Sequence, residues 1–224
     1  MKPLLAWDID GTLLTSGGAG RNALNGAFFE CFGTADVFAK VDFRGRIDPS
    51  LIQEAFSVAK RPFTEGDAMY LKKTYLRRLR EELEARASSM TVHPGALEAV
   101  LRCAPHATNA LVTGNWREGA FAKLEAAGLD SHFSWGAFGG DGVVRNDLVP
   151  VLRKRALERG VETERVIVIG DTPADVACAR AGNAEVVAVT TGGCSREQLA
   201  AAKPDLLLTN LEVDAEAFFD FVGC

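Results

Sequence analysis

Short unbroken apolar runs, most of them ending in small or polar residues, predict buried strands along the chain. The clearest runs lie at 3–7, 109–112 and 166–169, two more lie at 185–189 and 205–208, and a weaker one lies at 133–138. Runs of this length are typical of strands that are covered on both faces, as in a parallel sheet.

Helical patterns alternate with these strands in the second half of the chain. We expect helices near 116–127, 147–159, 173–181, 195–202 and 211–222. Strands that alternate with helices from about residue 108 to the end predict an α/β fold with a doubly wound, Rossmann-like parallel sheet.

The segment between residues 20 and 90 has a different pattern. It carries helical patterns near 20–32, 48–60 and 64–87, with no convincing strand among them. The third pattern is amphipathic, because Leu71, Tyr75 and Leu79 recur at helical spacing among charged residues. We therefore expect a helical domain at 16–91, inserted after the first strand of an α/β core domain at 1–15 and 92–224. Its joints would be the turn-forming stretches 15–20 and 91–95.

Composition indicates a folded protein and excludes several classes. Of 224 residues, 47% are hydrophobic, and 25 Lys and Arg stand against 30 Asp and Glu, a formal charge of −5. This mild acidity gives no basic footprint for nucleic acid, and no apolar run reaches the roughly 18–20 residues of a membrane helix. The N-terminus turns acidic at Asp8, too early for a signal peptide, so we expect a cytoplasmic protein with five free cysteines.

Acidic residues follow two of the predicted strands. Asp8 and Asp10 end the first strand, and Asp171 and Asp175 follow the strand at 166–169. Parallel strands place such residues at one edge of a sheet, where ligands gather. Carboxylates in close proximity repel each other unless a cation lies between them or one takes a proton. The pairs therefore predict a Mg²⁺ site, or a nucleophile beside an acid/base group.

The strand at 109–112 ends in Thr113-Gly114-Asn115, a hydroxyl and exposed amides just before a predicted helix, where an anion is favoured. Together these motifs resemble the signatures of the haloacid dehalogenase superfamily of phosphohydrolases. The run 8–13, Asp-Ile-Asp-Gly-Thr-Leu, resembles the first signature, Thr113 the second and 170–175 the fourth. The third signature, normally a lysine, is assigned to Arg145, with Lys154 as the alternative.

The resemblance implies a role for each motif residue. Asp8 would be the nucleophile that takes up the phosphoryl group, and Asp10 would protonate the leaving alcohol and then activate water. Thr113, Gly114 and Asn115 would hold the phosphoryl oxygens, and Arg145 would neutralise their charge. Magnesium would be bound by Asp8, Asp10, Asp171 and Asp175.

The helical insertion resembles the type 1 cap of the superfamily, which suits small, soluble phosphate esters. The segment 43–49 resembles the Gly-Arg-Thr-Asp stretch of phosphoglycolate-phosphatase-like members, with Ile47 in place of the threonine. In that case Arg44 or Arg46 would meet an anionic leaving group and Asp48 would cap the next helix; the alternative is an ordinary solvated turn.

Three other functions remain open on the same scaffold. A sugar-phosphate mutase uses the same signatures. A phosphonatase needs a Schiff-base lysine, and Lys40, Lys60, Lys72 and Lys73 lie in no matching motif. A non-catalytic phosphate-binding module would be expected to lose Asp8 or Asp10. The main expectation is thus a Mg²⁺-dependent phosphatase of a small phosphate ester, with no nucleic-acid or membrane partner, acting as a monomer or homodimer.

Overall fold

A computed structural model describes residues 1–39 and 41–224 of the chain, so Lys40 lies outside the described residues. Its main sheet has six parallel strands in the order β5-β4-β1-β6-β7-β8, which confirms the predicted α/β sheet. The strands are β1 (Leu4–Trp7), β4 (Thr108–Thr113), β5 (Gly136–Phe138), β6 (Val166–Gly170), β7 (Glu185–Val189) and β8 (Leu206–Leu208).

Both faces of this sheet are covered by helices, as the unbroken apolar runs predict. Side chains alternate along β1, so that Leu5 and Trp7 join one apolar cluster and Leu4 and Ala6 the other. The first cluster includes residues of α4 (Ala96–Cys103), α5 (Arg117–Ala126) and α9 (Ala215–Val222), and the second includes residues of α6 (Leu148–Glu158) and α7 (Pro173–Ala181). Another helix, α8 (Arg196–Ala201), buries Leu199.

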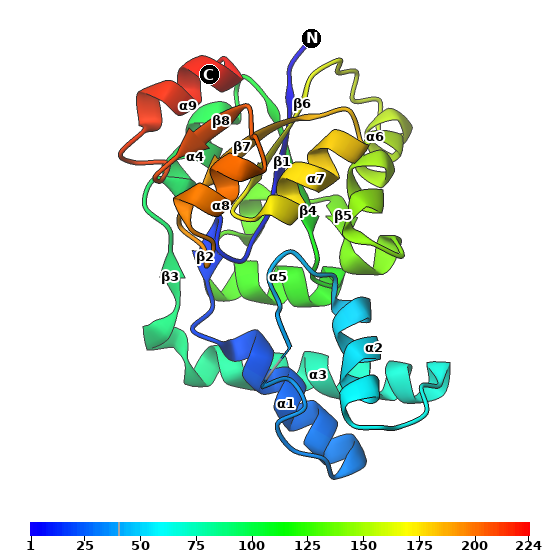
Figure 1. Cartoon of the computed structure of the whole chain (residues 1–224). Coiled ribbons are helices and arrows are strands. Elements are labelled where there is room, and N and C mark those ends of the chain that lie inside the picture. The colour runs from blue at the N-terminus through cyan, green and yellow to red at the C-terminus, as the bar shows by residue number, and fades with distance from the viewer. Residues whose placement is uncertain (40) are drawn as a thin grey trace.

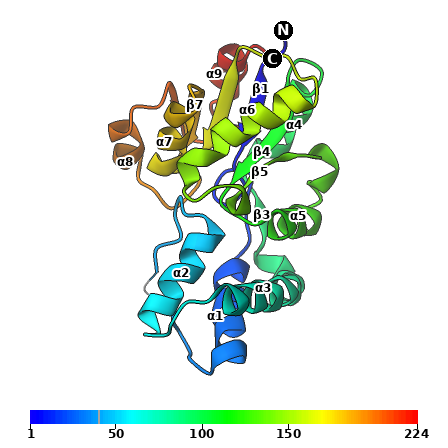
Figure 2. The ribbon, with the colours of Figure 1, turned by 90° about the vertical axis from the view of Figure 1, so that its right-hand side faces the viewer.

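The helices α1 (Ala19–Phe32), α2 (Asp48–Val58) and α3 (Glu65–Ala85) form a separate lobe below the sheet, which we call the cap (Figure 1). Its own core packs Phe28, Phe38 and Phe56 edge to face. Trp116, at the start of α5, also belongs to this core, and its ring centroid lies 5.7 Å from that of Tyr75 of α3. Figure 2 shows the cap at one end of the molecule and both chain ends at the other.

Two short strands connect the cap to the sheet, and the sequence analysis did not predict them. β2 (Leu14–Thr15) and β3 (Thr91–Val92) pair antiparallel, so the chain enters and leaves the cap side by side. Two residues are too few to produce a periodic pattern.

Two helices also differ from the prediction. The helix α4 was not predicted; it begins directly after Gly95, whose backbone φ of 76° ends the preceding turn. The last helix begins at Ala215 instead of residue 211, because the side chain of Asn210 accepts hydrogen bonds from the amides of Glu212 and Val213 and holds a turn there. Among the helices of residues 1–39 and 41–224, none combines the length and apolar character that crossing a membrane requires.

Candidate active site

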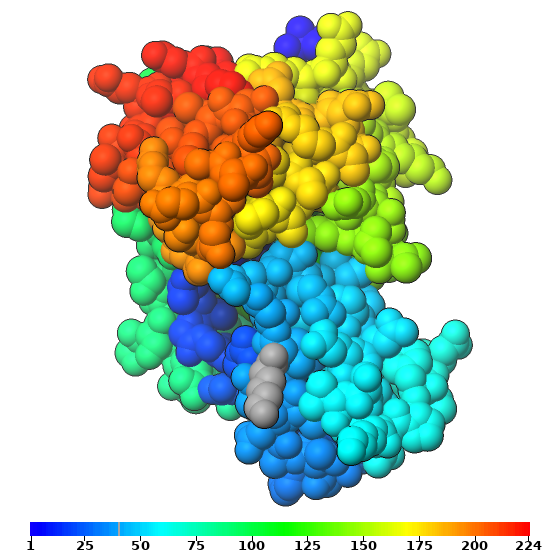
Figure 3. Space-filling model, in the orientation of Figure 1, coloured from blue at the N-terminus to red at the C-terminus, as the bar shows by residue number. Residues whose placement is uncertain are grey.

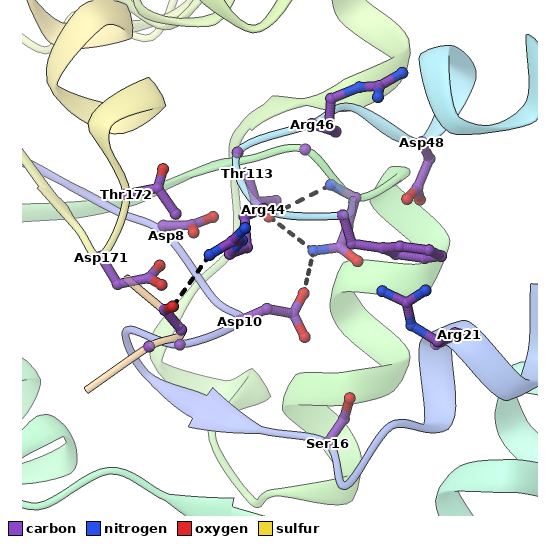
Figure 4. Close-up of a pocket in the computed structure, with 18 of the residues that line it drawn as sticks. Asp8, Asp10, Ser16, Arg21, Arg44, Arg46, Asp48, Thr113, Asp171 and Thr172 are labelled. Carbon is purple, nitrogen blue, oxygen red and sulfur yellow. Dashed lines mark hydrogen bonds between the residues drawn. The ribbon is translucent and has the colours of Figure 1, made fainter. Parts of the chain in front are cut away.

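The carboxyl ends of the three central strands meet at a cavity of about 340 Å³ between the sheet and the cap. Asp8 follows β1, Thr113 ends β4 and Asp171 follows β6. Because β4 lies on one side of β1 and β6 on the other, the strand order reverses at this point of the parallel sheet, where ligands bind in open α/β folds. Figure 4 shows Asp8, Thr113 and Asp171 around one space, with Asp10 below them.

Asp8 is buried, and its backbone amide donates to the carbonyl of Ile169 at 2.9 Å. Its Oδ1 lies 3.1 Å from Nη2 of Arg145. Burial raises the pKa of Asp8 to about 6 although the Arg145 charge opposes this shift. The carboxylate of Asp8 is thus buried at the carboxyl end of β1, with the guanidinium of Arg145 beside it. This arrangement is suited to a nucleophile.

Of the two candidates for the third signature, the structure brings Arg145 into the cavity. Its side chain is 8% exposed, lies on the short helix η4 (Arg145–Asp147) and contacts both Asp8 and Asp175. Its Nε is buried with no hydrogen-bond partner within the described residues. Lys154 instead lies on the outer face of α6, with its side chain 80% exposed and 3.9 Å from Glu158.

Three carboxylates gather beside Arg145. Oxygen atoms of Asp8, Asp171 and Asp175 lie within 4.8 Å of one another. Burial and the charges of Asp175 and Asp8 raise the pKa of Asp171 well above its usual range. Hard oxygen donors that repel one another in this way fit Mg²⁺, which would remove the repulsion.

The members of this cluster are not equivalent. Both oxygens of Asp175 already accept hydrogen bonds, Oδ1 from Arg145 and Oδ2 from the amide and hydroxyl of Thr172 at 2.9 and 2.7 Å. Asp171 accepts only a long bond of 3.4 Å from the Thr12 hydroxyl among the described side chains. Asp171 is therefore the freer of the two to bind a metal, and Asp175 fixes the loop and Arg145 around it.

Glycines make room for the Asp171 carboxylate. A Cβ at Gly11 would lie 2.4 Å from Asp171 Oδ2, and one at Gly192 would lie 1.7 Å from it. Gly11 also has a φ of 86°, a left-handed conformation that favours glycine. This explains the glycine of the first motif; Gly192, which sequence reasoning missed, becomes recognisable only when its loop is placed against β6.

Asp10 and Asn115 meet on the cap side of Asp8. The Asn115 Nδ2 donates to Asp10 Oδ2 and to the Thr113 hydroxyl, both at 2.8 Å. A third residue, Lys123 of α5, donates from Nζ to the same Asp10 oxygen at 2.6 Å and was missed by sequence reasoning. The available signal was a lysine among Gly119, Ala120, Ala122 and Leu124, the buried residues of α5.

The cap closes the cavity with its segment 43–48. The Asp48 amide donates to the Gly114 carbonyl at 2.8 Å, and Nη1 of Arg44 donates to the Gly193 carbonyl at 3.2 Å. A Cβ at Gly45, whose φ is 65°, would lie 2.3 Å from Cβ of Ala174. Cap and sheet domain are thus in direct contact over the site, as the space-filling view shows (Figure 3).

The two arginines of this segment have different surroundings. Arg44 reaches across the cavity towards the loop at Gly193 and pairs with Asp42 at 2.8 Å (Figure 4). Arg46 points away from Asp8, and its guanidinium pairs with Glu54 at 2.6 Å. In this structure Arg44 is the one that reaches over the cavity between Asp8 and the loop at Gly193.

The expectation that Asp48 caps its own helix is wrong. Ile47 is the N-cap of α2 and makes no side-chain capping bond. The Asp48 carboxylate turns instead to the amide of Trp116 at 2.8 Å, at the start of α5. Backbone amides at the start of a helix have no partner within the helix and attract a carboxylate. At the start of α5, the Trp116 amide donates to the Asp48 carboxylate. Burial raises the pKa of Asp48 to about 6.

Known proteins align with this chain over most of its length. The chain is 28% identical to the "Probable phosphatase IndB" of Dickeya dadantii over 93% of this chain and 90% of that protein. It is 29% identical to a phosphoglycolate phosphatase of Rhodospirillum rubrum over 89% and 84%.

Solved structures share the fold. A predicted phosphoglycolate phosphatase from Haemophilus somnus superposes with a TM-score of 0.71 at 21% identity, over 96% of both chains. The β-phosphoglucomutase of Clostridium difficile superposes with a TM-score of 0.75 at 13% identity, over 100% of both chains. A family model described as haloacid dehalogenase-like hydrolase matches residues 5–180. The chain belongs to the family of haloacid dehalogenase-like hydrolases.

Proposed function

We propose that this protein is a Mg²⁺-dependent phosphatase that hydrolyses a small phosphomonoester, phosphoglycolate-like or a sugar phosphate, through an aspartyl-phosphate. The observation that carries the proposal is the position of Asp8, buried at the centre of the sheet edge and 3.1 Å from Arg145. The names of relatives that align over most of the chain, a probable phosphatase and a phosphoglycolate phosphatase, support the same reaction class.

In the first step, an oxygen of Asp8 attacks phosphorus, the new O–P bond forms and the bond from phosphorus to the leaving oxygen breaks. Asp10 gives its proton to that leaving oxygen, and the alcohol departs. Arg145 and the Thr113 hydroxyl are placed to hold the oxygens of the transferred group, because both line the cavity beside Asp8.

In the second step, Asp10 takes a proton from a water molecule, which attacks phosphorus and breaks its bond to Asp8. Inorganic phosphate is released, and Asp10 is protonated again for the next cycle. Asp8, Asp171 and the backbone carbonyl of Asp10 would hold Mg²⁺. When bound, Mg²⁺ supplies charge neutralisation for the carboxylates and the phosphoryl oxygens.

The cavity also supports a small substrate. Its volume is about 340 Å³, at the lower end of the range for small-molecule sites. On the side opposite the acidic cluster it is lined by cap residues, among them Ser16, Arg21 and Tyr75. These would surround the leaving alcohol and leave little room for a polymer.

Release of inorganic phosphate from a panel of small phosphomonoesters, with Mg²⁺ and with EDTA, tests the proposal. We expect metal-dependent turnover concentrated on a few esters. Asp8→Asn removes the nucleophile without removing a core side chain, so we expect it to fold and to lose about 10⁴-fold or more in kcat. Turnover by Asp8→Asn, or no phosphate release from the wild type with any ester, would contradict the phosphatase mechanism.

A further inference from the structure

Lys123 is a buried cation for which the proposed reaction has so far supplied no role. The residue is 4% exposed, although lysines are almost never buried this far without a partner. Its Nζ donates to Asp10 Oδ2 at 2.6 Å and to Asn115 Oδ1 at 2.7 Å. The two acceptors are 113 and 8 positions away in the chain, so only the folded structure brings this group together.

The three side chains form a closed ring of hydrogen bonds. Asn115 Nδ2 donates to the same Asp10 oxygen at 2.8 Å, while its Oδ1 accepts from Lys123. The lysine therefore fixes which way the amide of Asn115 faces, because an ammonium can only donate. The amide in turn bonds the Thr113 hydroxyl at 2.8 Å and links the ring to the phosphate-binding motif.

The Asp10 side chain depends on this ring for its orientation. It is 42% exposed, and within the described residues its hydrogen bonds come only from Asn115 and Lys123. A carboxylate exposed to this degree has several rotamers available unless polar partners select one. Charge-assisted hydrogen bonds such as the one from Lys123 are the stronger kind.

Residues of the cap surround the ammonium group of Lys123. A Cβ at Gly20 would lie 3.6 Å from Nζ and 4.0 Å from the Tyr75 hydroxyl, which are ordinary van der Waals distances, so the backbone of α1 lies directly beside both groups. The cap therefore closes over the lysine from α1 and α3, while α5 carries it from the sheet domain. The ring lies where cap and sheet domain meet around the leaving-group side of the cavity.

We propose that Lys123 is a positioning residue for Asp10. It holds the Asp10 carboxyl group, directly and through Asn115, where Asp10 delivers a proton to the leaving oxygen. This inference rests on the proposed function and assigns Lys123 no contact with the reacting phosphorus. It has a specific consequence: loss of the lysine should matter most for leaving groups that need a proton and least for those that depart as stable anions.

A series of leaving groups tests this role. We would measure kcat and KM with alkyl phosphates, phenyl phosphate and p-nitrophenyl phosphate for the wild type, Lys123→Met, Lys123→Arg and Lys72→Met. For Lys123→Met we expect kcat to fall about 10²-fold on alkyl phosphates and less than about tenfold on p-nitrophenyl phosphate, since general acid catalysis contributes on this order. We expect Lys123→Arg, which keeps the charge, to recover part of the loss on alkyl esters.

Lys72→Met is the matched control, because Lys72 of α3 bonds Glu118 of α5 at 3.1 Å and does not line the cavity. It should show the wild-type dependence on the leaving group. Thermal unfolding of each variant reports whether it is folded, and if Lys123→Met does not fold, the same comparison is made with Lys123→Gln, which also removes the charge.

An equal loss on every leaving group would overturn the positioning role while leaving the phosphatase function intact. A wild type that releases no phosphate from any of these esters in the presence of Mg²⁺ would overturn the proposed function, and this inference with it.

Discussion

Arg145 connects the carboxylates that follow β1 and β6, because its Nη2 atom contacts both Asp8 and Asp175. These negative charges raise the pKa of the Arg145 guanidinium above its already high ordinary value, although burial opposes this shift. The group therefore keeps its positive charge, so in the proposed reaction it would neutralise Asp8 and the transferred phosphoryl group at every working pH.

We expect Arg145→Ala to lower kcat/KM for phosphate esters by about 10²-fold or more, as removal of one charge-stabilising donor does in other active sites. Lys154→Ala should remain within about twofold of the wild type, because its ammonium is on the surface. Steady-state kinetics on the best ester of the panel measures both. The reverse order of effects would move the third motif to α6.

The sequence predicted the meeting of Asp8, Thr113 and Asp171 correctly, because each follows a strand and parallel strands end at one edge. It did not predict Lys123 as a partner of Asp10. The helix α5 is buried on two sides, with Ala120 and Leu124 in a sheet cluster and Ala122 in the cap core. The packing of the cap against α5 decides which side Lys123 faces. The periodicity of apolar residues along one helix does not show how another domain packs against it.

Contacts between secondary-structure elements set how the cap sits on the sheet domain, and Asp48 provides one of them. It begins α2 of the cap and bonds the Trp116 amide at the start of α5. Lys123 and Lys72 attract its charge and Asp10 repels it, but burial dominates and raises its pKa from 3.8 to about 6. The folded protein therefore binds this proton more tightly than the unfolded chain does.

This difference gives a dependence of stability on pH. Between about pH 4 and 6 the folded state holds more protons at Asp48, so the free energy of unfolding falls as pH rises through this window. Asp48→Asn keeps a side-chain oxygen for Trp116 and removes the charge. The free energy of unfolding of this variant, relative to that of the wild type, should therefore be higher at pH 8 than at pH 4. The increase should be up to about 3 kcal/mol for a shift of about two pKa units.

Denaturant unfolding of both proteins at pH 4 and pH 8 measures this gain, because the other acids are common to the pair and cancel. Asp42→Asn is the control, since Arg44 lowers the pKa of this exposed carboxyl to about 2. The stability of Asp42→Asn relative to the wild type should not increase between pH 4 and pH 8. A constant difference between Asp48→Asn and the wild type at the two pH values would refute the assignment.

Among the elements, a helix whose start is marked by capping residues was predicted well, and short elements without such a mark were not. The helix α7 (Pro173–Ala181) has the predicted bounds, because Thr172 and Asp175 form a capping box at its start. The eight-residue α4 and the two-residue strands β2 and β3 were missed. No side-chain capping bond marks the start of α4, and the pairing of β2 with β3 is a tertiary contact.

On the scale of the whole molecule, a cluster of buried carboxylates lies at the edge of the sheet that faces the cap. Asp8, Asp171 and Asp175 each have 5% or less of their surface exposed, and Arg145 is their one buried cationic partner in the described part of the chain. Uncompensated buried charge destabilises a fold. The site is therefore expected to reduce the stability of the metal-free protein, and Mg²⁺ binding is expected to restore it.

Asp171→Asn separates these two effects, because it removes a charge at nearly constant volume. In EDTA we expect the variant to be more stable than the wild type, since one source of repulsion is gone. On addition of Mg²⁺ the wild type should gain about 2.7 kcal/mol at a concentration 100 times its dissociation constant. The variant should lose most of this gain because it lacks a metal ligand.

Thermal unfolding in EDTA and across a Mg²⁺ titration measures both differences, and Asp220→Asn, an exposed position on α9, controls for the change in net charge. A wild-type protein whose stability does not respond to Mg²⁺ would count against a metal at this edge of the sheet. An Asp171→Asn variant that keeps the full gain would place the metal elsewhere. If only the wild type and Asp220→Asn gain stability on addition of Mg²⁺, the cation binds at the carboxylate cluster and relieves the repulsion there.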